Sequence, residues 1–447
     1  MNTKGTAGAN LRNTMLINLA TMAMNVGASV ICARMLGPAG RGAFSVVQLW
    51  PILATGIGTL GLPRAVAFYL GKNRRDTGVV TTGAFALLIA GILSAAILYF
   101  VIPKLAASQP PSVIAYTRWS LALLPLLYLG SLPYYALQGL HRLRIWNSIR
   151  VQFSVLWLAM HVTGYLLKRT DLGFYVCGYI LVTAVHNLTW LAVFVVQFPL
   201  AGTVRKDLVR GLFKYGLPLT LGSLPLSLNL RLDQVLMAAL VPPRMLGLYV
   251  IAVAWSGMTA PALTALSQVL FPMLLGLDDR ARQFTLLARS FRLSAVCAAA
   301  CAALLMICTP VAIPLIYGRA FTEASLAACI LVAGSVFLAT NTMLSEGFRA
   351  VGLTKYPMYA ELAGFAATGV LLPILLPRWP LVGASVASLI SYAVTGAVLV
   401  SCAARSGDTS LRTLTVPQAT DFRVLSRLLR EACFKIRPAR TEKCISY

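Results

Sequence analysis

The stretch "LGPAGRGAFSVVQLW", residues 36–50, has a counterpart in "VPPRMLGLYVIAVAW", residues 241–255. At an offset of 205 residues, a proline, a glycine, an aromatic residue and a tryptophan recur in the same order. The matched pairs are Pro38 and Pro243, Gly42 and Gly247, Phe44 and Tyr249, and Trp50 and Trp255. Because each stretch follows a long apolar segment, the repeat predicts two similar halves, 1–205 and 206–403, followed by a tail at 404–447.

The composition indicates a membrane protein. The chain has 447 residues, of which 58% are hydrophobic and only 11% are charged, and its mean hydropathy is +0.78. A soluble chain is nearer 25% charged. Apolar stretches of about 20 residues recur from residue 14 to residue 403, and each is long enough to cross roughly 30 Å of hydrocarbon as a helix. We therefore predict an all-α polytopic membrane protein rather than a soluble multidomain one.

The apolar stretches predict about twelve transmembrane helices, six in each half. Their expected ranges are 14–33, 43–62, 80–102, 119–140, 150–167, 173–198, 215–240, 246–275, 293–316, 324–345, 356–376 and 381–403. If the N-terminus is cytoplasmic, most of the 38 Lys and Arg residues fall in inner segments, as the positive-inside rule requires. Both termini are then cytoplasmic, and two halves that start on the same side are parallel repeats. Such repeats are typical of transporters, which bind substrate at the repeat interface.

The net charge of +25 does not indicate a nucleic-acid partner, because the basic residues lie in short connections between spans rather than on one face. The same short connections leave no room for a catalytic or nucleotide-binding domain. A Gly-rich phosphate loop followed by lysine, which an ATP-driven pump would need, is not found. The nine cysteines are not accompanied by a cluster of histidines and carboxylates, so we expect no metal site and no cofactor.

Charges within the predicted seventh span are the main functional signal. The segment "LSLNLRLDQVLMAALV", 226–241, carries Arg231 and Asp233, and Asn229 and Gln234 add polarity. On one continuous helix, positions two apart lie roughly 200° apart, so the two charges cannot form a simple helix-face ion pair. An ionisable residue inside a membrane is a functional candidate by default. Two interpretations stay open: the polar residues bind substrate or couple transport to an ion, or they pair with other helices and fix the packing.

Two further arginines are candidates for substrate binding. Arg64 ends the second predicted span in "GLPRAVAFY", and Arg34 lies near the outer end of the first. Either can contact an anionic head group, or can be a charge that only sets the topology. Pro218 and Pro225 lie in the seventh span, where prolines weaken a helix as a straight rod, so we predict a hinge there or a static kink.

Four residues are candidates for ion coupling. Asp233 and Glu361 are the carboxylates placed clearly within the predicted spans, and His161 and His186 lie in the fifth and sixth spans. If transport is driven by protons or sodium, the coupling group is expected among these four. The alternative for each histidine is a packed polar residue.

The tail carries a separate signal. In "DFRVLSRLLREACFKIR", 421–437, apolar residues recur at spacings of three and four with basic residues mostly on the other faces. This pattern is typical of an amphipathic helix that lies on an anionic inner leaflet. The alternatives are that the tail contacts a partner such as a glycosyltransferase, or that it is disordered.

Five segments, in this order and spacing, resemble one family. They are "ARMLGPAGRGAFSVVQLWP" (33–51), "ALQGLHRLRIWNSIR" (136–150), "KYGLPLTLGSLPLSLNLRLDQVLMAALVPPRMLGLYVIAVAW" (214–255), "LIYGRAFTEAS" (315–325) and "LVGASVASLISY" (381–392). Over residues 11–403 the chain resembles bacterial polysaccharide biosynthesis flippases of the multidrug/oligosaccharidyl-lipid/polysaccharide (MOP) exporter superfamily. The resemblance implies a V-shaped pair of six-helix lobes that work by alternating access. The resemblance does not assign functional roles to individual residues of this chain.

The function implied by the resemblance is the transfer of a lipid-linked oligosaccharide of the undecaprenyl-pyrophosphate type from the inner to the outer leaflet of the bacterial cytoplasmic (inner) membrane. The pathway would be capsule, exopolysaccharide or O-antigen synthesis. Membrane lipids would surround a monomer, and a polysaccharide polymerase or glycosyltransferases would be its partners. No covalent chemistry is expected.

Three alternatives are less well supported by the residues. A cation-coupled drug or metabolite antiporter would favour carboxylates in the first six predicted spans, which contain none. A saccharide polymerase or ligase would need a sizeable outer loop with catalytic residues. A lipid II flippase would add C-terminal spans, for which the tail is too polar.

Overall fold

A computed structural model describes residues 3–418 except 74–75, 141, 199, 201, 260–273, 275, 278, 407–410 and 417. The tail helix predicted at 421–437 lies outside the described residues, as does most of the end of the predicted eighth span.

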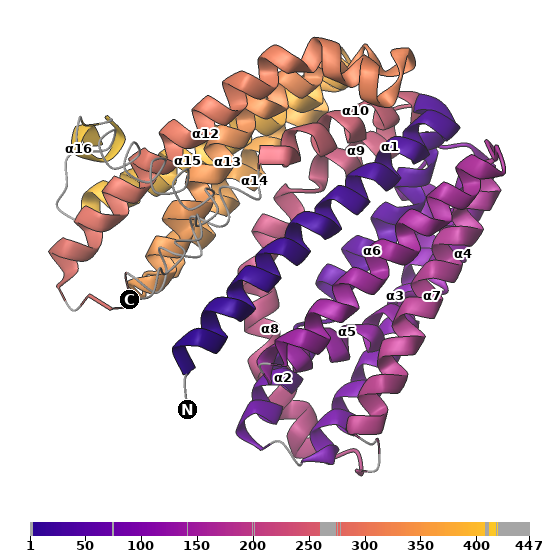
Figure 1. The fold of residues 1–447 in the computed structure, drawn as a ribbon, viewed down its shortest axis with the longest axis vertical. Helices are drawn as coiled ribbons and strands as arrows, with labels where there is room; N and C mark the ends of the chain where they lie inside the picture. Colours follow the sequence, from indigo (N-terminus) through magenta and orange to yellow (C-terminus); the bar gives the residue numbers. More distant parts are fainter. Residues whose placement is uncertain are drawn as a thin grey trace, which may run out of the picture. The chain divides into compact units, whose positions relative to one another are not determined.

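Throughout the described residues the secondary structure is helical, and none of them forms a strand (Figure 1). The α-helices are α1 (Thr3–Gly58), α2 (Leu62–Lys72), α3 (Thr77–Leu105), α4 (Pro111–Leu121), α5 (Leu124–Gly139), α6 (Leu143–Leu166), α7 (Leu172–Gln197), α8 (Lys206–Asn229), α9 (Leu232–Leu240), α10 (Pro243–Ser256), α12 (Arg280–Tyr317), α13 (Ala324–Ala350), α14 (Lys355–Leu375), α15 (Pro380–Ser406) and α16 (Leu411–Thr415). Two short 3₁₀ helices, η1 (Gly257–Thr259) and η2 (Arg319–Phe321), complete the described elements.

Helix α1 joins the first two predicted spans without a loop. Its axis is interrupted at Gly37, which has φ 65° and ψ −179°. Only glycine adopts such a conformation at no steric cost, and Pro38 follows with no N–H to offer to the preceding turn. Leu16–Gly58 contains 43 residues, roughly 65 Å of helix, about twice the hydrocarbon thickness. One helix with a turn at its middle therefore has the length of two crossings.

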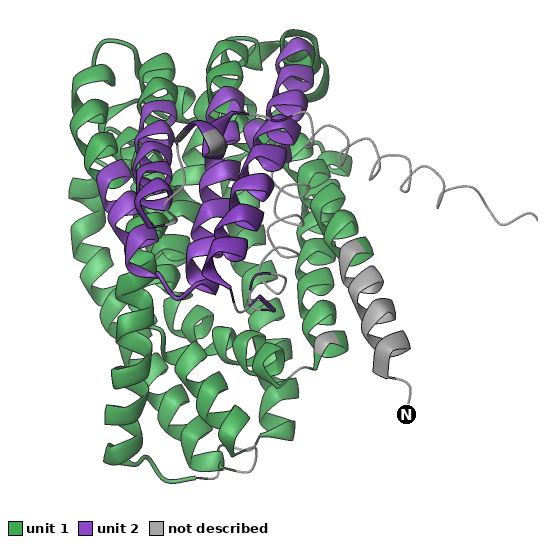
Figure 2. Ribbon diagram, turned by 90° about the vertical axis from the view of Figure 1, so that its left-hand side faces the viewer, with its two compact units in different colours: residues 1–255, 308–331, 365–388 green, residues 256–307, 332–364, 389–447 purple. Residues whose placement is uncertain are grey.

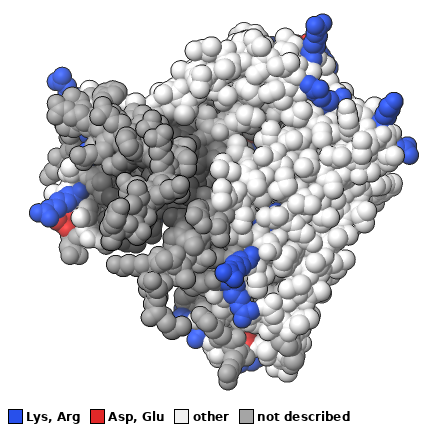
Figure 3. All heavy atoms as spheres, viewed as in Figure 1, with Lys and Arg blue, Asp and Glu red and all other residues white. Residues whose placement is uncertain are grey.

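The membrane character predicted from composition is confirmed. Seven described helices are long and apolar enough to cross a membrane, or eight if α4 and α5, which bend by 48°, form one span. Large apolar side chains such as Phe100, Val196 and Ile307 stay exposed, as expected where lipid replaces water. Figure 3 shows a wide uncharged surface between the groups of Lys and Arg side chains. The total of twelve spans and the cytoplasmic termini stay predictions.

The chain divides into two compact units (Figure 2). The first consists of residues 1–255, 308–331 and 365–388, and the second of 256–307, 332–364 and 389–447. In the first unit α1 packs along α6 and contacts α4 and α7, whereas α2 and α3 pack on α5. The division into halves at 205 and 403 rests on the repeat and stays a prediction.

The second unit has its own apolar core. Phe284, Leu287, Phe291, Met343 and Phe348 are among the buried side chains that form it. These residues come from the first half of α12 and the second half of α13. The unit is thus held by aliphatic and aromatic packing.

The two repeated stretches contact each other in the first unit. A Cβ atom at Gly42 would lie 1.8 Å from the carbonyl oxygen of Pro243, and one at Gly247 would lie 1.9 Å from the carbonyl oxygen of Pro38. Gly42 thus contacts the backbone of Pro243, and Gly247 contacts the backbone of Pro38. The two prolines are counterparts in the repeat, so the contact is symmetric. Glycine is required at both positions because α1 and α10 cross here with their backbones in direct contact.

Candidate functional site

The predicted seventh span is not one continuous helix, which corrects the expectation for 215–240. Helix α8 ends at Asn229 and α9 begins at Leu232. The last turn tightens, because the Arg231 N–H donates to the carbonyl oxygen of Leu228 at 3.0 Å, and Arg231 itself has a non-helical φ of −133°. Arg231 is therefore the N-cap residue of a new helix rather than a position on a helix face.

Both predicted hinge prolines lie upstream of this break. Pro218 and Pro225 are inside α8, which runs through both positions without interruption. A break at residues 230–231 had no sequence signal of its own. Movement at Pro218 or Pro225 stays a prediction.

The Asp233 carboxylate binds helices rather than Arg231. Its Oδ1 accepts the backbone N–H of Gln234 at 2.7 Å, and its Oδ2 accepts the hydroxyl of Tyr249 and, at 3.4 Å, that of Ser388. Asp233, Tyr249 and Ser388 are all buried. A buried carboxylate requires such partners to offset its desolvation. The contacts join α9, α10 and α15.

Asn229 makes a similar connection to α14. Its Oδ1 accepts the hydroxyl of Thr368 at 2.9 Å, and both residues are buried. Gln234 is buried too, and its Oε1 accepts from Arg231 Nη1 at 3.2 Å. The polar residues predicted around Arg231 are therefore brought together by the α8–α9 break, and most of them contact other helices of the first unit.

Arg231 forms no direct ion pair with a described residue, although the Asp233 carboxylate lies close enough to interact with its charge. No ion pair to Arg231 occurs among the described residues; its one charged neighbour along the chain, Asp233, is turned to Tyr249 and Ser388. Its side chain lines a cavity of about 360 Å³ in the first unit. The cavity wall also includes Trp50, Leu53, Ala54, Ile57, Gly58, Ser94, Ile97, Leu98, Tyr128, Leu228, Leu232 and Val235. An unpaired cation in a mostly apolar wall attracts an anion strongly, because little water competes.

Three further residues affect the chemistry or the shape of this cavity, and none of them was singled out from the sequence as a site residue. The indole Nε1 of Trp50 is buried and has no hydrogen-bond partner among the described residues. The hydroxyl of Tyr128 donates to the carbonyl oxygen of Ala54 at 2.7 Å and lies 2.9 Å from Ser94 Oγ. A Cβ at Gly58 would lie 2.1 Å from the Tyr128 hydroxyl oxygen, so any other residue there would displace the Tyr128 side chain. The repeat drew attention to Trp50, but no pattern indicated Tyr128 or Gly58.

The other two predicted arginines are not among the residues that line the cavity beside Arg231. Arg34 donates from Nε to the carbonyl oxygen of Ile316 at 2.8 Å and from Nη2 to that of Leu315 at 2.6 Å. A cation is favourable there because the C-terminal end of a helix, here α12, carries partial negative charge. Arg64 is exposed, with its guanidinium 5.4 Å from the centre of the Tyr135 ring. Substrate contact by Arg34 or Arg64 stays a prediction.

The four coupling candidates are dispersed. His161 is buried on α6, where its Nδ1 lies 2.8 Å from the carbonyl oxygen of Trp157 and its ring packs against that indole. His186 is half-buried on α7 and contacts Gln152 Oε1 at 2.9 Å. Glu361 belongs to the second unit. Within the described part of the chain no three His, Cys, Asp or Glu side chains gather into a group suited to a metal ion.

Comparison with known proteins gives the fold and the family. A model of the family described as "Polysaccharide biosynthesis protein" matches residues 7–277. The structure is similar to that of the lipid II flippase MurJ in an inward closed conformation, with a TM-score of 0.71, 12% sequence identity, and coverage of 96% of this chain and 93% of that one.

Two transporter structures extend this likeness. An inward-facing multidrug resistance MATE transporter of the MOP superfamily has a TM-score of 0.70, 15% identity, and coverage of 89% of this chain and 99% of that one. A MOP superfamily transporter from Pyrococcus furiosus has a TM-score of 0.61 and 16% identity, with coverage of 90% and 95%. A search of curated proteins finds no match. Because the family model covers more than half of the chain, the protein belongs to the polysaccharide biosynthesis family, and its fold is that of the MOP superfamily of membrane transporters.

Proposed function

We propose that the protein is a flippase that carries a lipid-linked oligosaccharide, with an undecaprenyl-pyrophosphate-type anchor, from the inner to the outer leaflet of the bacterial cytoplasmic membrane. The observation that carries this proposal is Arg231, a cation without an acidic partner among the described residues, in the wall of a cavity of about 360 Å³. Family membership supports the saccharide pathway.

The chemistry of such a substrate explains why a membrane arginine is needed. Its lipid tail can stay in hydrocarbon, but the pyrophosphate and the sugar hydroxyls would lose their water on crossing, at a cost of several kcal/mol for each unpaired group. A guanidinium stays charged at all relevant pH values, and its planar fork pairs two phosphate oxygens at once. In this proposal Arg231 binds the pyrophosphate during transfer, and a small movement of the Trp50 ring lets its buried N–H donate to a neighbouring oxygen.

Export of organic cations is less consistent with the same cavity. Its lining residues include an arginine and no carboxylate. The one nearby carboxylate, Asp233, accepts hydrogen bonds from Tyr249 and Ser388 instead of facing an open space. A cationic drug would meet like charge and no counter-ion.

A complementation experiment tests the proposal. Cells that lack the protein should accumulate the lipid-linked oligosaccharide on the inner leaflet, and the wild-type chain should restore it to the outer leaflet. We expect Arg231→Ala to abolish this restoration although the protein reaches the membrane, and Arg231→Lys to restore it in part. Unchanged sidedness in cells without the protein would refute the flippase.

Arg244→Ala is the matched control. Arg244 lies 13 residues further along the chain and is exposed in an ion pair with Glu323 at 2.7 Å. Since an exposed pair contributes roughly 0–1 kcal/mol, its loss should leave export unchanged. If both variants lost export equally, the loss in Arg231→Ala would be a general effect of removing a positive charge, and it would not support a role in the cavity.

A further inference from the structure

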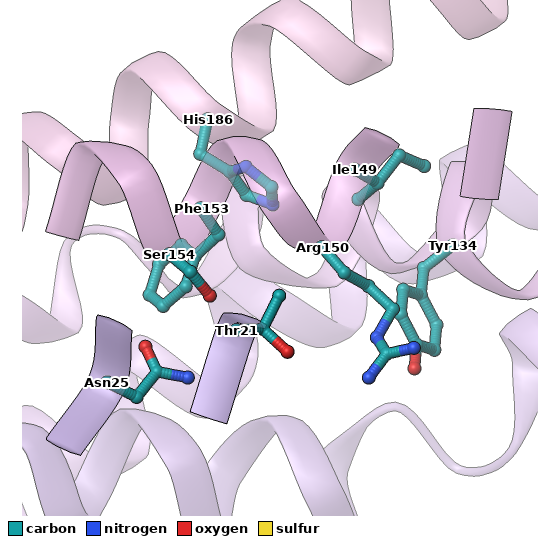
Figure 4. Close-up of a pocket in the computed structure, with 8 residues that line it drawn as sticks. All are labelled: Thr21, Asn25, Tyr134, Ile149, Arg150, Phe153, Ser154 and His186. Atoms are coloured by element: carbon teal, nitrogen blue, oxygen red, sulfur yellow. The ribbon is translucent and has the colours of Figure 1, made fainter. Parts of the chain in front are cut away.

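A second cavity in the first unit has a polar wall of a different kind (Figure 4). It measures about 270 Å³ and is lined by Thr21 and Asn25 of α1, Tyr134 of α5, Ile149, Arg150, Phe153 and Ser154 of α6, and His186 of α7. None of these eight residues is acidic. Four helices thus converge on one cation and several hydrogen-bonding groups.

Two of the polar groups form neither a hydrogen bond nor an ion pair in the described part of the chain. Ser154 is only 3% exposed, yet its hydroxyl is in no hydrogen bond, and Figure 4 shows its oxygen directed toward Thr21 across the pocket. The Arg150 guanidinium lies 4.7 Å from the centre of the Trp146 ring and forms no ion pair. The Ser154 hydroxyl and the half-buried Arg150 guanidinium both line the cavity, so both are available to a ligand that enters it.

The neighbouring side chains are held in place by contacts behind the pocket. His186 Nδ1 lies 2.9 Å from Gln152 Oε1, which also accepts the indole N–H of Trp190. With Nδ1 as the donor, Nε2 of His186 is an acceptor available to a hydroxyl. The Thr21 hydroxyl donates to the carbonyl oxygen of Ile17 at 2.9 Å, which leaves its oxygen free to accept.

Aromatic rings complete the wall. Phe153 packs edge-on against His186, with ring centres 5.2 Å apart, and stacks on Trp157 at 6.0 Å. Tyr134 lies 5.6 Å from Trp146. Aromatic faces beside amide, hydroxyl and imidazole groups suit the apolar face and the hydroxyls of a sugar ring.

We propose that this pocket binds one sugar residue that carries an oxyanion, with the oxyanion on Arg150 and the sugar hydroxyls on Ser154, His186 and Asn25. The proposal rests on the proposed function, because it makes this unit a part of the lipid-linked oligosaccharide. The cavity is smaller than the roughly 300–1,000 Å³ of pockets for drug-sized ligands, so it fits a single residue and not a whole repeat unit. The oxyanion can come from the phosphate that links the first sugar to the lipid or from the carboxylate of a uronic acid.

Direct binding to the purified full-length protein tests the assignment. The probes are glucose 1-phosphate, glucuronate, methyl glucoside and inorganic phosphate, measured by calorimetry. We expect at least one anionic sugar to bind at least tenfold more tightly than methyl glucoside, because a charge-assisted bond to Arg150 is lost in the neutral sugar. Tighter binding of glucose 1-phosphate assigns the lipid-linked sugar, and tighter binding of glucuronate assigns a uronic acid of the repeat unit.

Variants connect the binding to this pocket. Arg150→Gln should weaken binding of the preferred anionic sugar at least tenfold, and Arg150→Lys should retain part of it. Ser154→Leu should abolish binding by filling the cavity. Arg144→Gln is the matched control, because Arg144 lies on the same helix, is exposed and does not line the pocket. Wild-type affinity in Arg150→Gln, or inorganic phosphate bound as tightly as the anionic sugars, overturns the proposal.

The pocket and the flippase can fail separately. If no anionic sugar binds while the protein still moves the lipid-linked oligosaccharide, the pocket assignment is refuted and the transport function stands. If anionic sugars bind through Arg150 while the oligosaccharide stays on the inner leaflet, the pocket is supported and the transport function is refuted.

Discussion

The two repeated stretches, 36–50 and 241–255, share a backbone crossing but differ in what their side chains do. Gly42 and Gly247 each face the backbone of the opposite stretch, at positions where a Cβ would have no space. The aromatic counterparts, Phe44 and Tyr249, make different contacts. Phe44 packs against the rings of Trp157, His161, Tyr175 and Tyr179, whereas the Tyr249 hydroxyl binds Asp233 and lies 3.2 Å from Ser388.

The difference extends beyond one residue. At the same offset, the counterpart of Asp233 is Ala28, which is completely buried. Asp233 and Tyr249 contact each other, and their counterparts at the same offset, Ala28 and Phe44, are both apolar. Both stretches thus have glycine at the backbone contact, whereas the buried Asp233–Tyr249 pair has an apolar counterpart in the first repeat.

The largest expected effect comes from side chains at the crossing. Gly42→Ala and Gly247→Ala should each lower the free energy of unfolding by roughly 3 kcal/mol or more, because the added Cβ must displace backbone. Thermal unfolding of the purified protein measures this. Gly56→Ala on α1 is the control, because nothing lies within 4 Å of a Cβ there and the change should be neutral or stabilising. A large effect at one glycine only would break the equivalence of the two stretches.

A double-mutant cycle tests the matched pair. Tyr249→Phe and Asp233→Ala should each cost about 1–3 kcal/mol, because each leaves a buried partner with fewer hydrogen bonds. The double variant restores the combination found at Ala28 and Phe44, so it should cost less than the sum by about 1 kcal/mol or more. Strict additivity in chemical unfolding would show that the two residues do not stabilise the fold as a coupled pair.

The smallest effect distinguishes the two tryptophans. Trp255 donates from Nε1 to Thr309 Oγ1 at 2.8 Å, so Trp255→Phe should cost about 1 kcal/mol from that bond alone. Trp50 has no acceptor among the described residues, so Trp50→Phe should leave the thermal unfolding midpoint nearly unchanged and weaken substrate binding in the cavity. Equal destabilisation by both changes, with binding unaffected, would contradict a ligand role for the Trp50 N–H.

The sequence predicted the features that depend on composition and on local polarity. Apolar length predicted membrane-spanning helices, whereas the repeat predicted two similar halves and not the contact between α1 and α10. Intramembrane polarity directed attention to Arg231 and Asp233 and to the residues beside them. These features are local along the chain, so a single sequence contains them.

The sequence did not predict what depends on distant neighbours. The helix breaks between α8 and α9, and not at Pro218 or Pro225. Arg231 therefore starts a helix instead of lying on a helix face. The partners of Asp233 lie on α10 and α15, and the cavity beside Arg231 is completed by Tyr128 and Gly58. These contacts join residues separated by as many as 155 positions, which no local pattern encodes.

Movement of a lipid-linked oligosaccharide across reconstituted vesicles tests the central claim most directly. The purified chain should move the substrate between leaflets, Arg231→Ala should reduce the rate at least tenfold, and Arg231→Lys should be intermediate. The control Arg244→Ala should match the wild type. Transfer by Arg231→Ala at the wild-type rate would contradict the role of Arg231, and no transfer by the wild-type chain under conditions where it is folded would contradict the flippase itself.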